Sequence, residues 1–592
     1  MISRSLFTVL VLVILSAANP LRLEEALVLP AGWRKLDTKP KPDQKLHLSF
    51  ALRQPEIESI KKKITSRGEN FGSHLAYEDA QSLRDPDQAD VDSVLAWLEE
   101  YGLAGQATTI RDWIHVKTTV QEAESFLKMD LNYFQFEDKR PVLRTQEYFV
   151  PEGLSEAISF VHPIANFMRP KRELGSVVSD ATPKMLETHS ELDKRAEGCN
   201  LTVTPACLRD LYNISYSPTD GESSIRLGIA GFLEQYANYR DSDLFLETLA
   251  PDLYAKGYNY SVELVNGGQN SQNLFQSGAE AALDVQYALA LGHPTNITYY
   301  LSGGRGAELD DNGEPLSEEE SENEPYLEFL EYLLDLTDER LPHVLSISYA
   351  DDEVSVPLPY AIRVCNLLGV LTSRGTTVLV ASGDGGARGS SDSKCRTNDG
   401  TDKDVAMSVF PGSCPWVTAV GAVKNVGDPP DGAEYSGGGF SQYFKRPSWQ
   451  DAAVSSYVTE LDGFMSGYYD PNFRALPDIS AVGSSFMVKQ AGQTRVLRGT
   501  SASTPVIAAM IALIDDARVR QGKPVLGWLN GILYTEEARA VLQDITGGQS
   551  LSCNFREGGL IGGWPAKRGW DAITGLGVPY DFQKLFDVLV EV

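Results

Sequence analysis

The chain of 592 residues is poor in the residue types that build metal sites and nucleic-acid surfaces. It has only 6 Cys and 7 His, which argues against a Cys-rich or His-rich metal site. Its 52 basic residues are outnumbered by 81 acidic ones, and the net charge of −29 would repel nucleic acid or an anionic membrane. With 22% charged and 42% hydrophobic residues, the chain is still too apolar to be disordered and long enough for at least two cores.

Long apolar runs are rare as well, and the one of note lies at the N-terminus. Arg4 supplies a positive charge, residues 6–15 form an apolar run, and Ser16 and Ala18 suit a cut after Ala18. These features predict a secretory signal peptide over residues 1–18, because the run is too short to span a bilayer; a buried core helix is the alternative. No later run reaches about 18 apolar residues, so we expect a soluble, secreted protein or, alternatively, one delivered to an acidic vacuole or lysosome.

Two further patterns indicate an oxidising, glycosylating compartment. Four Asn-X-Ser/Thr sequons lie close together, at Asn200, Asn213, Asn259 and Asn296. The even number of cysteines predicts disulfides, for which about 15 pairings exist. The cysteines are Cys199, Cys207, Cys365, Cys395, Cys414 and Cys553. We expect a local Cys199–Cys207 pair; free thiols in the core are the alternative.

A polar joint divides the chain into two unlike parts. Residues 173–195 carry no apolar period and end in Lys194-Arg195, a dibasic pair of the kind that processing proteases cleave. Residues 19–195 hold 24 basic and 29 acidic residues, whereas residues 196–592 hold 27 and 52. We therefore interpret residues 19–195 as a pro-domain and residues 196–592 as the mature protein. An ordinary interdomain linker is the alternative, and Lys171-Arg172 is a competing processing site.

The alternation of strands and helices in the second part predicts a parallel α/β sheet with helices on both faces. The expected strands are 225–232, 261–265, 297–301, 343–347, 376–381 and 416–420, and the expected helices are 278–291, 326–334 and 360–374. Such sheets bind ligands at the carboxyl ends of their strands. The first part predicts a compact α+β domain. Its expected elements are helices 54–64 and 90–101 and strands 109–116 and 147–150.

Two acidic residues, Glu280 and Asp284, share one face of the helix expected over 278–291. Their neighbours are Ala, Leu, Val and Tyr, which indicates a buried face. Two buried carboxylates repel unless they share a proton or bind a partner, and a pair that shares a proton makes a general base. The alternative is a capping box formed by Ser277 and Glu280, which leaves Asp284 unexplained.

A run of small residues, Arg498-Gly-Thr-Ser-Ala-Ser-Thr-Pro505, leads into an apolar helix expected over 506–514. A hydroxyl at a helix N-terminus lies beside backbone N–H groups and the positive end of the helix dipole, which suits a nucleophile and an oxyanion. Ser501 is the expected nucleophile. The alternative is that Ser503 or Thr504 merely caps the helix, with Pro505 in its first turn.

The second part offers no suitable histidine as the base that a serine nucleophile needs. His293 follows a helix and His343 opens a buried strand, and neither has the surroundings of a base beside an open cleft. We therefore expect Glu280 and Asp284 to supply a carboxylate base. A carboxylate of pKa about 4–5 is half ionised only in acid, so activity should be highest there.

A third acid, Asp384, follows the strand expected over 376–381, at the edge where such sheets hold active sites. In acid its carboxyl can be protonated and donate a hydrogen bond to an oxyanion. A plain Asp-Gly turn is the alternative.

Together these motifs resemble those of the sedolisin family, the serine-carboxyl peptidases. They are Gly499-Thr-Ser-Ala-Ser503, the acid pair in EAALDVQY, and Ser382-Gly-Asp384-Gly, and the run Leu345–Glu353 is similar to the tripeptidyl-peptidase branch with its secreted fungal enzymes. The resemblance covers nearly the whole chain and implies a subtilisin-like α/β fold behind an inhibitory pro-domain. It also implies residue roles: Ser501 as nucleophile, Glu280 as general base and later acid, Asp284 as the holder of Glu280, and Asp384 at the oxyanion hole.

The same resemblance implies one calcium ion near the C-terminus. Asp544 and Asp571 would bind it through carboxylates, and Ile545, Lys567 and Gly569 through backbone carbonyls. Such hard oxygen ligands suit Ca²⁺.

Three positions depart from the family's pattern without removing a catalytic group. Arg498 stands where a small residue is usual, Gly385 where Ser is common, and Lys567 where Gly is frequent. Of these, we expect only Arg498 to alter the substrate cleft.

The sequence thus predicts a secreted, acid-acting serine-carboxyl peptidase, made as a zymogen, which cleaves peptides and proteins through an acyl-enzyme on Ser501. We expect a monomer inhibited by its own pro-domain. Release of tripeptides from free N-termini follows from the resemblance alone. The alternatives are an acid endopeptidase of the same family, a catalytically silent, secreted calcium-binding glycoprotein, and a His-dependent protease of the subtilisin type.

Overall fold

The structure is a computed structural model that describes most of the chain. The described residues are 20–25, 29, 33–57, 59–60, 72–136, 141–165, 167, 179–180, 199, 202–218, 222–304, 324–389, 395–397, 403–427, 430–556 and 558–592. The expected signal peptide, the pair Lys194-Arg195 and the sequon at Asn200 lie outside them. Below, residues 20–167 are called the N-terminal unit and residues 202–592 the C-terminal unit.

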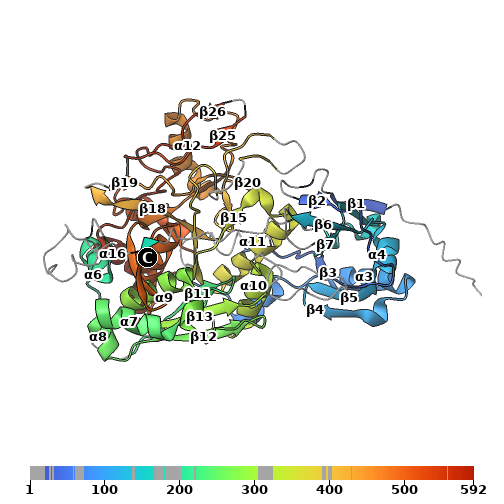
Figure 1. The fold of residues 1–592 in the computed structure, drawn as a ribbon, viewed down its shortest axis with the longest axis horizontal. Coiled ribbons are helices and arrows are strands. Elements are labelled where there is room, and N and C mark those ends of the chain that lie inside the picture. Colours follow the sequence, from blue (N-terminus) through green and yellow to red (C-terminus); the bar gives the residue numbers. More distant parts are fainter. Residues whose placement is uncertain are drawn as a thin grey trace, which may run out of the picture.

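An eight-stranded sheet forms the centre of the C-terminal unit (Figure 1). The strand order is β12-β13-β11-β14-β16-β18, with β22 and β19 both paired to β18, and every pairing except that of β19 is parallel. The strands are β11 (Arg226–Gly231), β12 (Tyr260–Val265), β13 (Asn296–Ser302), β14 (Val344–Ile347), β16 (Thr377–Ala381), β18 (Thr418–Gly427), β19 (Pro430–Gly432) and β22 (Ile479–Val482). The expected parallel sheet is confirmed.

Helices cover both faces of this sheet, as expected. Alternate side chains of β11 point to opposite sides: Leu227 and Ile229 join one hydrophobic cluster, and Ala230 joins the other. The first cluster includes residues of α7 (Tyr239–Leu249), α9 (Ala279–Gly292) and α13 (Thr500–Arg520), and the second those of α10 (Tyr326–Asp335) and α11 (Leu358–Ser373). The three helices expected from the sequence correspond to α9, α10 and α11.

Shorter elements complete the C-terminal unit. They are α6 (Pro205–Leu211), α8 (Pro251–Ala255), β15 (Asp351–Asp352), β17 (Val409–Phe410), β20 (Gly439–Lys445), α12 (Asp451–Glu460), β21 (Phe473–Leu476), β23 (Phe486–Gln490), β24 (Gln493–Leu497), α14 (Asn530–Leu533), α15 (Glu536–Arg539), β25 (Asn554–Phe555), β26 (Gly559–Leu560) and α16 (Phe582–Glu591). Between the units, β10 (Ser179–Asp180) pairs with β24.

The N-terminal unit is an α+β fold with its own core, as expected. Its antiparallel sheet has the order β4-β5-β3-β9. The elements are β1 (Pro20–Glu25), β2 (Trp33–Lys35), β3 (Lys45–Leu52), α2 (Tyr77–Ser82), α3 (Gln88–Glu100), β4 (Ala107–Ile110), β5 (Trp113–Thr119), α4 (Val120–Leu127), β6 (Asn132–Phe136), β7 (Val142–Arg144), β8 (Glu147–Pro151) and β9 (Ile158–His162). One expectation is wrong: residues 109–116 form two strands, because a turn at Arg111, whose φ is 50°, reverses the chain between β4 and β5.

The two units share an interface at α10 and α11, beside which the N-terminal unit lies in Figure 1. Asp112 is fully buried there, and its carboxylate accepts hydrogen bonds from Arg84 at 3.1 Å, from Gln54 at 2.6 Å and from Arg363 of α11. Arg84 also pairs with Glu331 of α10. A buried, charged network therefore joins residues that lie more than two hundred positions apart.

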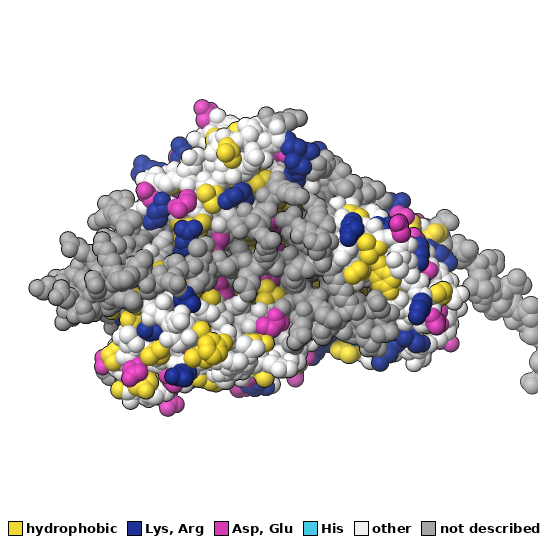
Figure 2. Space-filling model, viewed as in Figure 1, with side chains coloured by type: hydrophobic (Ala, Val, Ile, Leu, Met, Phe, Trp, Pro, Cys, Tyr) yellow, Lys and Arg dark blue, Asp and Glu magenta, His cyan; other side chains and the backbone are white. Residues whose placement is uncertain are grey.

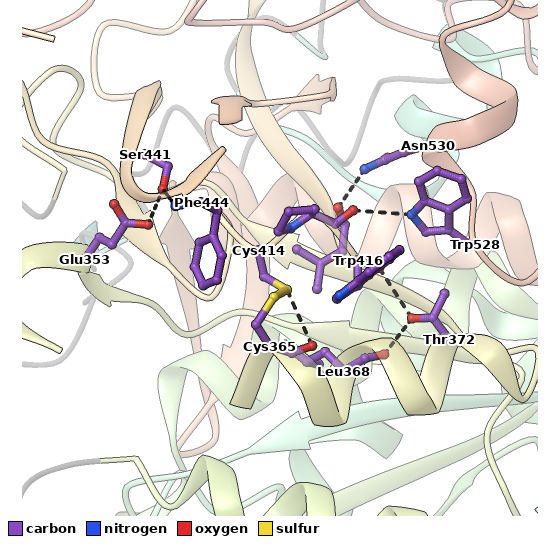
Figure 3. The surroundings of a disulfide bond; sticks show 12 residues. Glu353, Cys365, Leu368, Thr372, Cys414, Trp416, Ser441, Phe444, Trp528 and Asn530 are labelled. Atoms are coloured by element: carbon purple, nitrogen blue, oxygen red, sulfur yellow. Dashed lines mark hydrogen bonds between the residues drawn. A yellow bond between two sulfur atoms is a disulfide. The ribbon is translucent and has the colours of Figure 1, made fainter. Parts of the chain in front are cut away.

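All six cysteines are paired: Cys199 with Cys207, as expected, Cys365 with Cys414, and Cys395 with Cys553. The alternative of free core thiols is therefore wrong. Figure 3 shows the second bond, which ties α11 to the segment before β18. Beside it, the hydroxyl of Thr372 on α11 bonds the carbonyls of Leu368 (2.8 Å) and Trp416 (3.3 Å).

Figure 2 shows how the charged side chains are distributed on one face of the molecule. On the face drawn in Figure 2, acidic and basic side chains are interspersed, with no basic stripe among the described residues. None of the helices within the described ranges combines the length and the apolar character needed to cross a bilayer.

Acid is expected to destabilise the full-length chain through His162. This imidazole, at the end of β9, stacks on the ring of Tyr360 in α11 with centroids 6.0 Å apart. Burial, with smaller effects from Arg144 and His115, lowers its pKa from 6.5 to about 3. Below about pH 6.5 the unfolded chain takes up a proton that the folded chain does not, so the free energy of unfolding should fall by about 1.4 kcal/mol per pH unit, down to about pH 3.

Urea unfolding of the Ser501→Ala chain at about pH 7 and about pH 5 measures this loss. His162→Phe keeps a ring against Tyr360 and should reduce the difference between the two conditions by about 2 kcal/mol. His47→Phe, on the neighbouring strand β3, is the control. An equal acid effect in both variants would exclude His162 as its source.

Candidate active site

The four residues expected to carry the chemistry come from elements that meet at the carboxyl-end edge of the sheet. Glu280 and Asp284 lie in the first two turns of α9, and Ser501 is the second residue of α13. Asp384 follows the end of β16. α9 and α13 pack against each other in the same hydrophobic cluster.

Ser348 connects the expected nucleophile to the expected acid pair. Ser501 is 1% exposed, and its Oγ donates a hydrogen bond to the backbone carbonyl of Ser348, just after β14, at 3.4 Å. The side chain of the same residue contacts the acid pair, because Ser348 Oγ donates to Asp284 Oδ1 at 3.0 Å. One buried residue therefore bonds both Ser501 and Asp284.

The acid pair has the electrostatics of two carboxyls that do not ionise together. Burial raises the pKa of Asp284 well above its usual range, and the charge of Glu280 raises it further, while the hydrogen bond from Ser348 lowers it. Both residues are buried, at 1% and 6% exposure. The pair thus retains a proton at pH values where exposed carboxyls have lost theirs, as expected for a shared-proton pair.

Asp384 binds the N-terminus of α13 directly. Its Oδ1 accepts hydrogen bonds from the backbone N–H of Thr500 at 2.7 Å and from the Thr500 hydroxyl at 2.9 Å. Gly499 permits this contact: its φ is 152°, and a Cβ there would stand 2.6 Å from Asp384 Oδ2. The N–H of Gly499 also bonds the carbonyl of Gly483, just beyond β22, at 2.9 Å. Asp384 therefore holds the turn that presents Ser501, which a plain Asp-Gly turn does not do.

The capping box considered for α9 is wrong. The helix begins after Gly278, and no side chain caps it there. The Ser277 hydroxyl donates instead to Asp241 Oδ2 at 2.7 Å, and the backbone N–H of Glu280 donates to Gln235 Oε1 at 3.0 Å. The Glu280 side chain is therefore not the second half of a local cap.

The capping alternative for the serine motif is wrong as well. α13 begins at Thr500, so Ser503, Thr504 and Pro505 all lie inside it. The Ser503 hydroxyl donates to the carbonyl of Ala481 in β22 at 3.0 Å. The helix thus starts one residue before Ser501, which places that hydroxyl in the first turn.

Neither histidine of the C-terminal unit lies at this edge. His293 follows the last residue of α9, roughly 20 Å along the helix axis from Glu280. His343 precedes β14 at the opposite edge of the sheet, where its Nδ1 accepts the backbone N–H of Arg226 at 3.1 Å. Burial lowers the pKa of His343 to about 3. The geometry therefore gives no support to a His-dependent mechanism.

The residues expected to bind calcium come from two segments, 544–545 and 567–571, that contact each other. The N–H of Gly569 donates to Asp544 Oδ2 at 2.8 Å, and the N–H of Lys567 donates to Asp571 Oδ2 at 3.4 Å. Burial raises the pKa of Asp571 to about 7, and it also raises the pKa of Asp544. Hydrogen bonds from Ile573 and Thr574 to Asp571, and the charges of Arg568 and Arg539 near Asp544, act in the opposite direction.

The oxygens of these two segments fit a hard cation. Asp544 Oδ1 is buried, and no hydrogen-bond partner for it is found within the described ranges. No hydrogen bond in the described part of the chain uses the carbonyls of Ile545, Lys567 or Gly569. Among the described residues there is no cluster of three or more Asp, Glu, His or Cys, so backbone oxygens must complete any such site.

The described sequons lie on the surface. Asn213, Asn259 and Asn296 are exposed, although the amide nitrogen of Asn296 already donates to the carbonyl of Ser223 at 2.7 Å.

Arg498 lies beside the turn that presents Ser501. Its guanidinium stacks on the ring of Tyr435 with 5.5 Å to the centroid.

Sequence reasoning gave no role to Ser348, Gln235 or Thr500. Ser348 stands in the Leu345–Glu353 run, whose only signal in the sequence is its resemblance to the tripeptidyl-peptidase branch. Its place directly after a buried strand, at the edge where ligands bind, is the signal that could have identified it.

Comparisons with known proteins identify both units. Residues 31–167 match the family model described as pro-kumamolisin, activation domain, and residues 317–544 match the subtilase family. Tripeptidyl-peptidase SED2 of Arthroderma otae is 38% identical over 575 residues, which cover 95% of this chain and 94% of that protein. Tripeptidyl-peptidase sed4 of Aspergillus fumigatus is 35% identical and covers 100% of both chains. A solved Pseudomonas sedolisin, in complex with pseudo-iodotyrostatin, is 19% identical over 65% of this chain and 97% of its own, with a TM-score of 0.47.

The fold and these matches define a serine-type peptidase that carries an N-terminal activation domain. The chain belongs to the sedolisin family, the serine-carboxyl peptidases. The family, the subtilisin-like fold and the enzyme class predicted from the sequence are thereby confirmed. The roles of individual residues and the domain boundary at residue 195 stay predictions.

Proposed function

We propose that this zymogen is secreted, acts in acid, and removes tripeptides from the free N-termini of peptides and proteins through an acyl-enzyme on Ser501. The names of its full-length relatives support the tripeptidyl mode. The observation that carries the proposal is the chain of contacts from Ser501 through Ser348 to Asp284, the neighbour of Glu280, at an edge without a histidine among the described residues.

The mechanism assigns one task to each group. Glu280, as carboxylate, removes the proton of Ser501 Oγ while this oxygen bonds to the scissile carbonyl carbon, and the carbonyl electron pair moves to its oxygen. Glu280 then gives the proton to the departing amine as the C–N bond breaks. Glu280 next takes a proton from water, whose oxygen bonds to the acyl carbon, and returns this proton to Ser501 Oγ as the ester C–O bond breaks. Because Oδ1 of Asp384 accepts two bonds from Thr500, a neutral Asp384 carries its proton on Oδ2 and can donate it to the oxyanion.

Two peptides and one variant test this function. The mature enzyme should release a tripeptide from an unblocked peptide in acid and leave its N-terminally blocked copy intact, and Ser501→Ala should cleave neither. Internal cleavage of both peptides would favour the endopeptidase alternative. Full activity in Ser501→Ala would refute the mechanism, and an inactive wild-type enzyme would favour the silent glycoprotein.

We also propose a structural calcium ion held by Asp544, Asp571 and the carbonyls of Ile545, Lys567 and Gly569. The proposal is supported by Asp544 Oδ1 and the three carbonyls, none of which has a hydrogen-bond partner among the described residues. The ion would supply positive charge to two carboxylates from different segments and so hold these segments together.

Removal of calcium is expected to lower the stability of the enzyme. With free Ca²⁺ at about a hundred times its dissociation constant, bound ion contributes about 2.7 kcal/mol, which a chelator would abolish. Thermal unfolding with and without EGTA measures the loss. Asp544→Asn should unfold at the lower temperature under both conditions, whereas Asp470→Asn, an exposed control, should behave like the wild type. A midpoint that EGTA does not move would refute the site.

A further inference from the structure

Ser348 occupies a position that no catalytic motif of the sequence marks. Its backbone carbonyl accepts the hydrogen bond of Ser501 Oγ, and its hydroxyl donates to Asp284 Oδ1. It is 0% exposed and follows β14 directly, so the central sheet rather than a long loop sets its place. The residue therefore contacts two members of the proposed machinery, Ser501 and Asp284.

The hydroxyl of Ser348 determines which oxygen of Asp284 can carry a proton. Within the described part of the chain, Asp284 Oδ1 is the recorded partner of Ser348 Oγ, so the hydroxyl hydrogen points to Oδ1. An oxygen that accepts this bond is the carbonyl-like oxygen of a protonated carboxyl. Asp284 Oδ2 is buried and has no hydrogen-bond partner among the described residues, so it is the oxygen left to hold the proton.

The alternative arrangement, with the proton on Oδ1, is less favourable. Ser348 Oγ would then accept from Asp284, and its own hydrogen would need another acceptor inside a fully buried site. No other acceptor for it is recorded in the described ranges, and a buried hydroxyl without an acceptor costs free energy.

We infer that Ser348 is a positioning residue whose hydroxyl keeps the proton of Asp284 on Oδ2, where it is available to Glu280. The inference rests on the proposed function. Burial and the charge of Glu280 keep Asp284 protonated against the opposing effect of this bond, and Ser348 determines which of its two oxygens carries the proton.

Ser348→Ala is expected to lower kcat by about 10- to 100-fold with KM within about 2-fold of the wild type, the size of loss that follows removal of one bond to an ionisable group. A second readout is the pH profile. The bond from Ser348 lowers the pKa of Asp284, so its removal should raise that pKa. The alkaline limb of kcat/KM, where Asp284 loses its proton, should therefore move to higher pH.

Three further variants separate this role from a structural one. Ser346→Ala removes another buried hydroxyl, two residues away in β14, which has no hydrogen-bond partner among the described residues; it should retain the wild-type kcat and pH profile. Ser348→Thr keeps the hydroxyl and should recover most of the activity. Should the alanine variant fail to fold, Ser348→Cys, of similar volume and with a poor donor, should show the same loss of kcat.

The outcomes distinguish this inference from the function on which it rests. An unchanged kcat and pH profile in Ser348→Ala, beside an inactive Ser501→Ala, overturns the role of Ser348 alone. Equal losses in Ser348→Ala and Ser346→Ala also overturn it, since packing would then explain both. Full activity in Ser501→Ala overturns the proposed function itself.

Discussion

Replacement of Glu280 by glutamine is expected to lower kcat by roughly 10²- to 10⁴-fold, the contribution of a general base to such reactions. Glutamine has nearly the same shape, but its amide cannot take the proton of Ser501 Oγ. Because Glu280 is only 6% exposed and its backbone N–H already bonds Gln235, the substitution should leave the start of α9 in place. Steady-state kinetics with an unblocked peptide in acid, after thermal unfolding confirms the fold, measures the effect.

Two companion variants make this result specific. Asp284→Asn should also lower kcat, since an amide cannot exchange a proton with Glu280. His293→Ala should leave kcat unchanged, because His293 lies at the far end of α9. A fully active Glu280→Gln, or an inactive but folded His293→Ala, would contradict the carboxylate mechanism.

Replacement of Asp112 by alanine is expected to loosen the pro-domain from the catalytic domain. The side chain is fully buried and binds both Arg84 of the pro-domain and Arg363 of α11. Its loss would leave two guanidinium groups without their shared carboxylate, although Arg84 keeps Glu331. Removal of one member of a buried ion pair typically costs about 3–5 kcal/mol.

Limited proteolysis of the Ser501→Ala chain near neutral pH measures this loss without interference from self-cleavage. The Asp112→Ala form should release its pro-domain sooner and unfold at a lower urea concentration. Asp130→Ala is the matched control, since that carboxylate is 65% exposed and pairs with Lys35 on the surface of the same domain. Exposed pairs contribute only about 0–1 kcal/mol, so equal behaviour of the two variants would mean that the buried network does not hold the domains together.

The central sheet could be predicted from the sequence because its strands are continuous apolar runs. Residues such as Thr377–Ala381 are buried on both faces, and that pattern is visible in the chain itself. The hairpin at Arg111 could not be predicted in this way. The next residue, Asp112, is bonded by Arg84 and Arg363, and these contacts between distant segments do not show in a local pattern.

In the candidate site, the sequence indicated the residue types but not their partners. The small-residue turn before Ser501 and the spacing of Glu280 and Asp284 were visible, and the structure places them on helices that pack together. The capping box failed because Ser277 bonds Asp241, a residue from another helix. Ser348 was missed for the same reason: its contacts join residues 64 and 153 positions away.

Burial along nearly the whole of α9 has a consequence for how this enzyme can vary. Every residue from Glu280 to Gly292 is buried, so almost no position of the helix faces solvent, where substitutions are usually tolerated. Moving the acid pair by a fraction of an ångström would require matching changes in several surrounding aliphatic side chains at once. Homologues with new specificities should therefore differ in the loops that line the substrate cleft. The sequence of the helix that carries the two acids should change little among them.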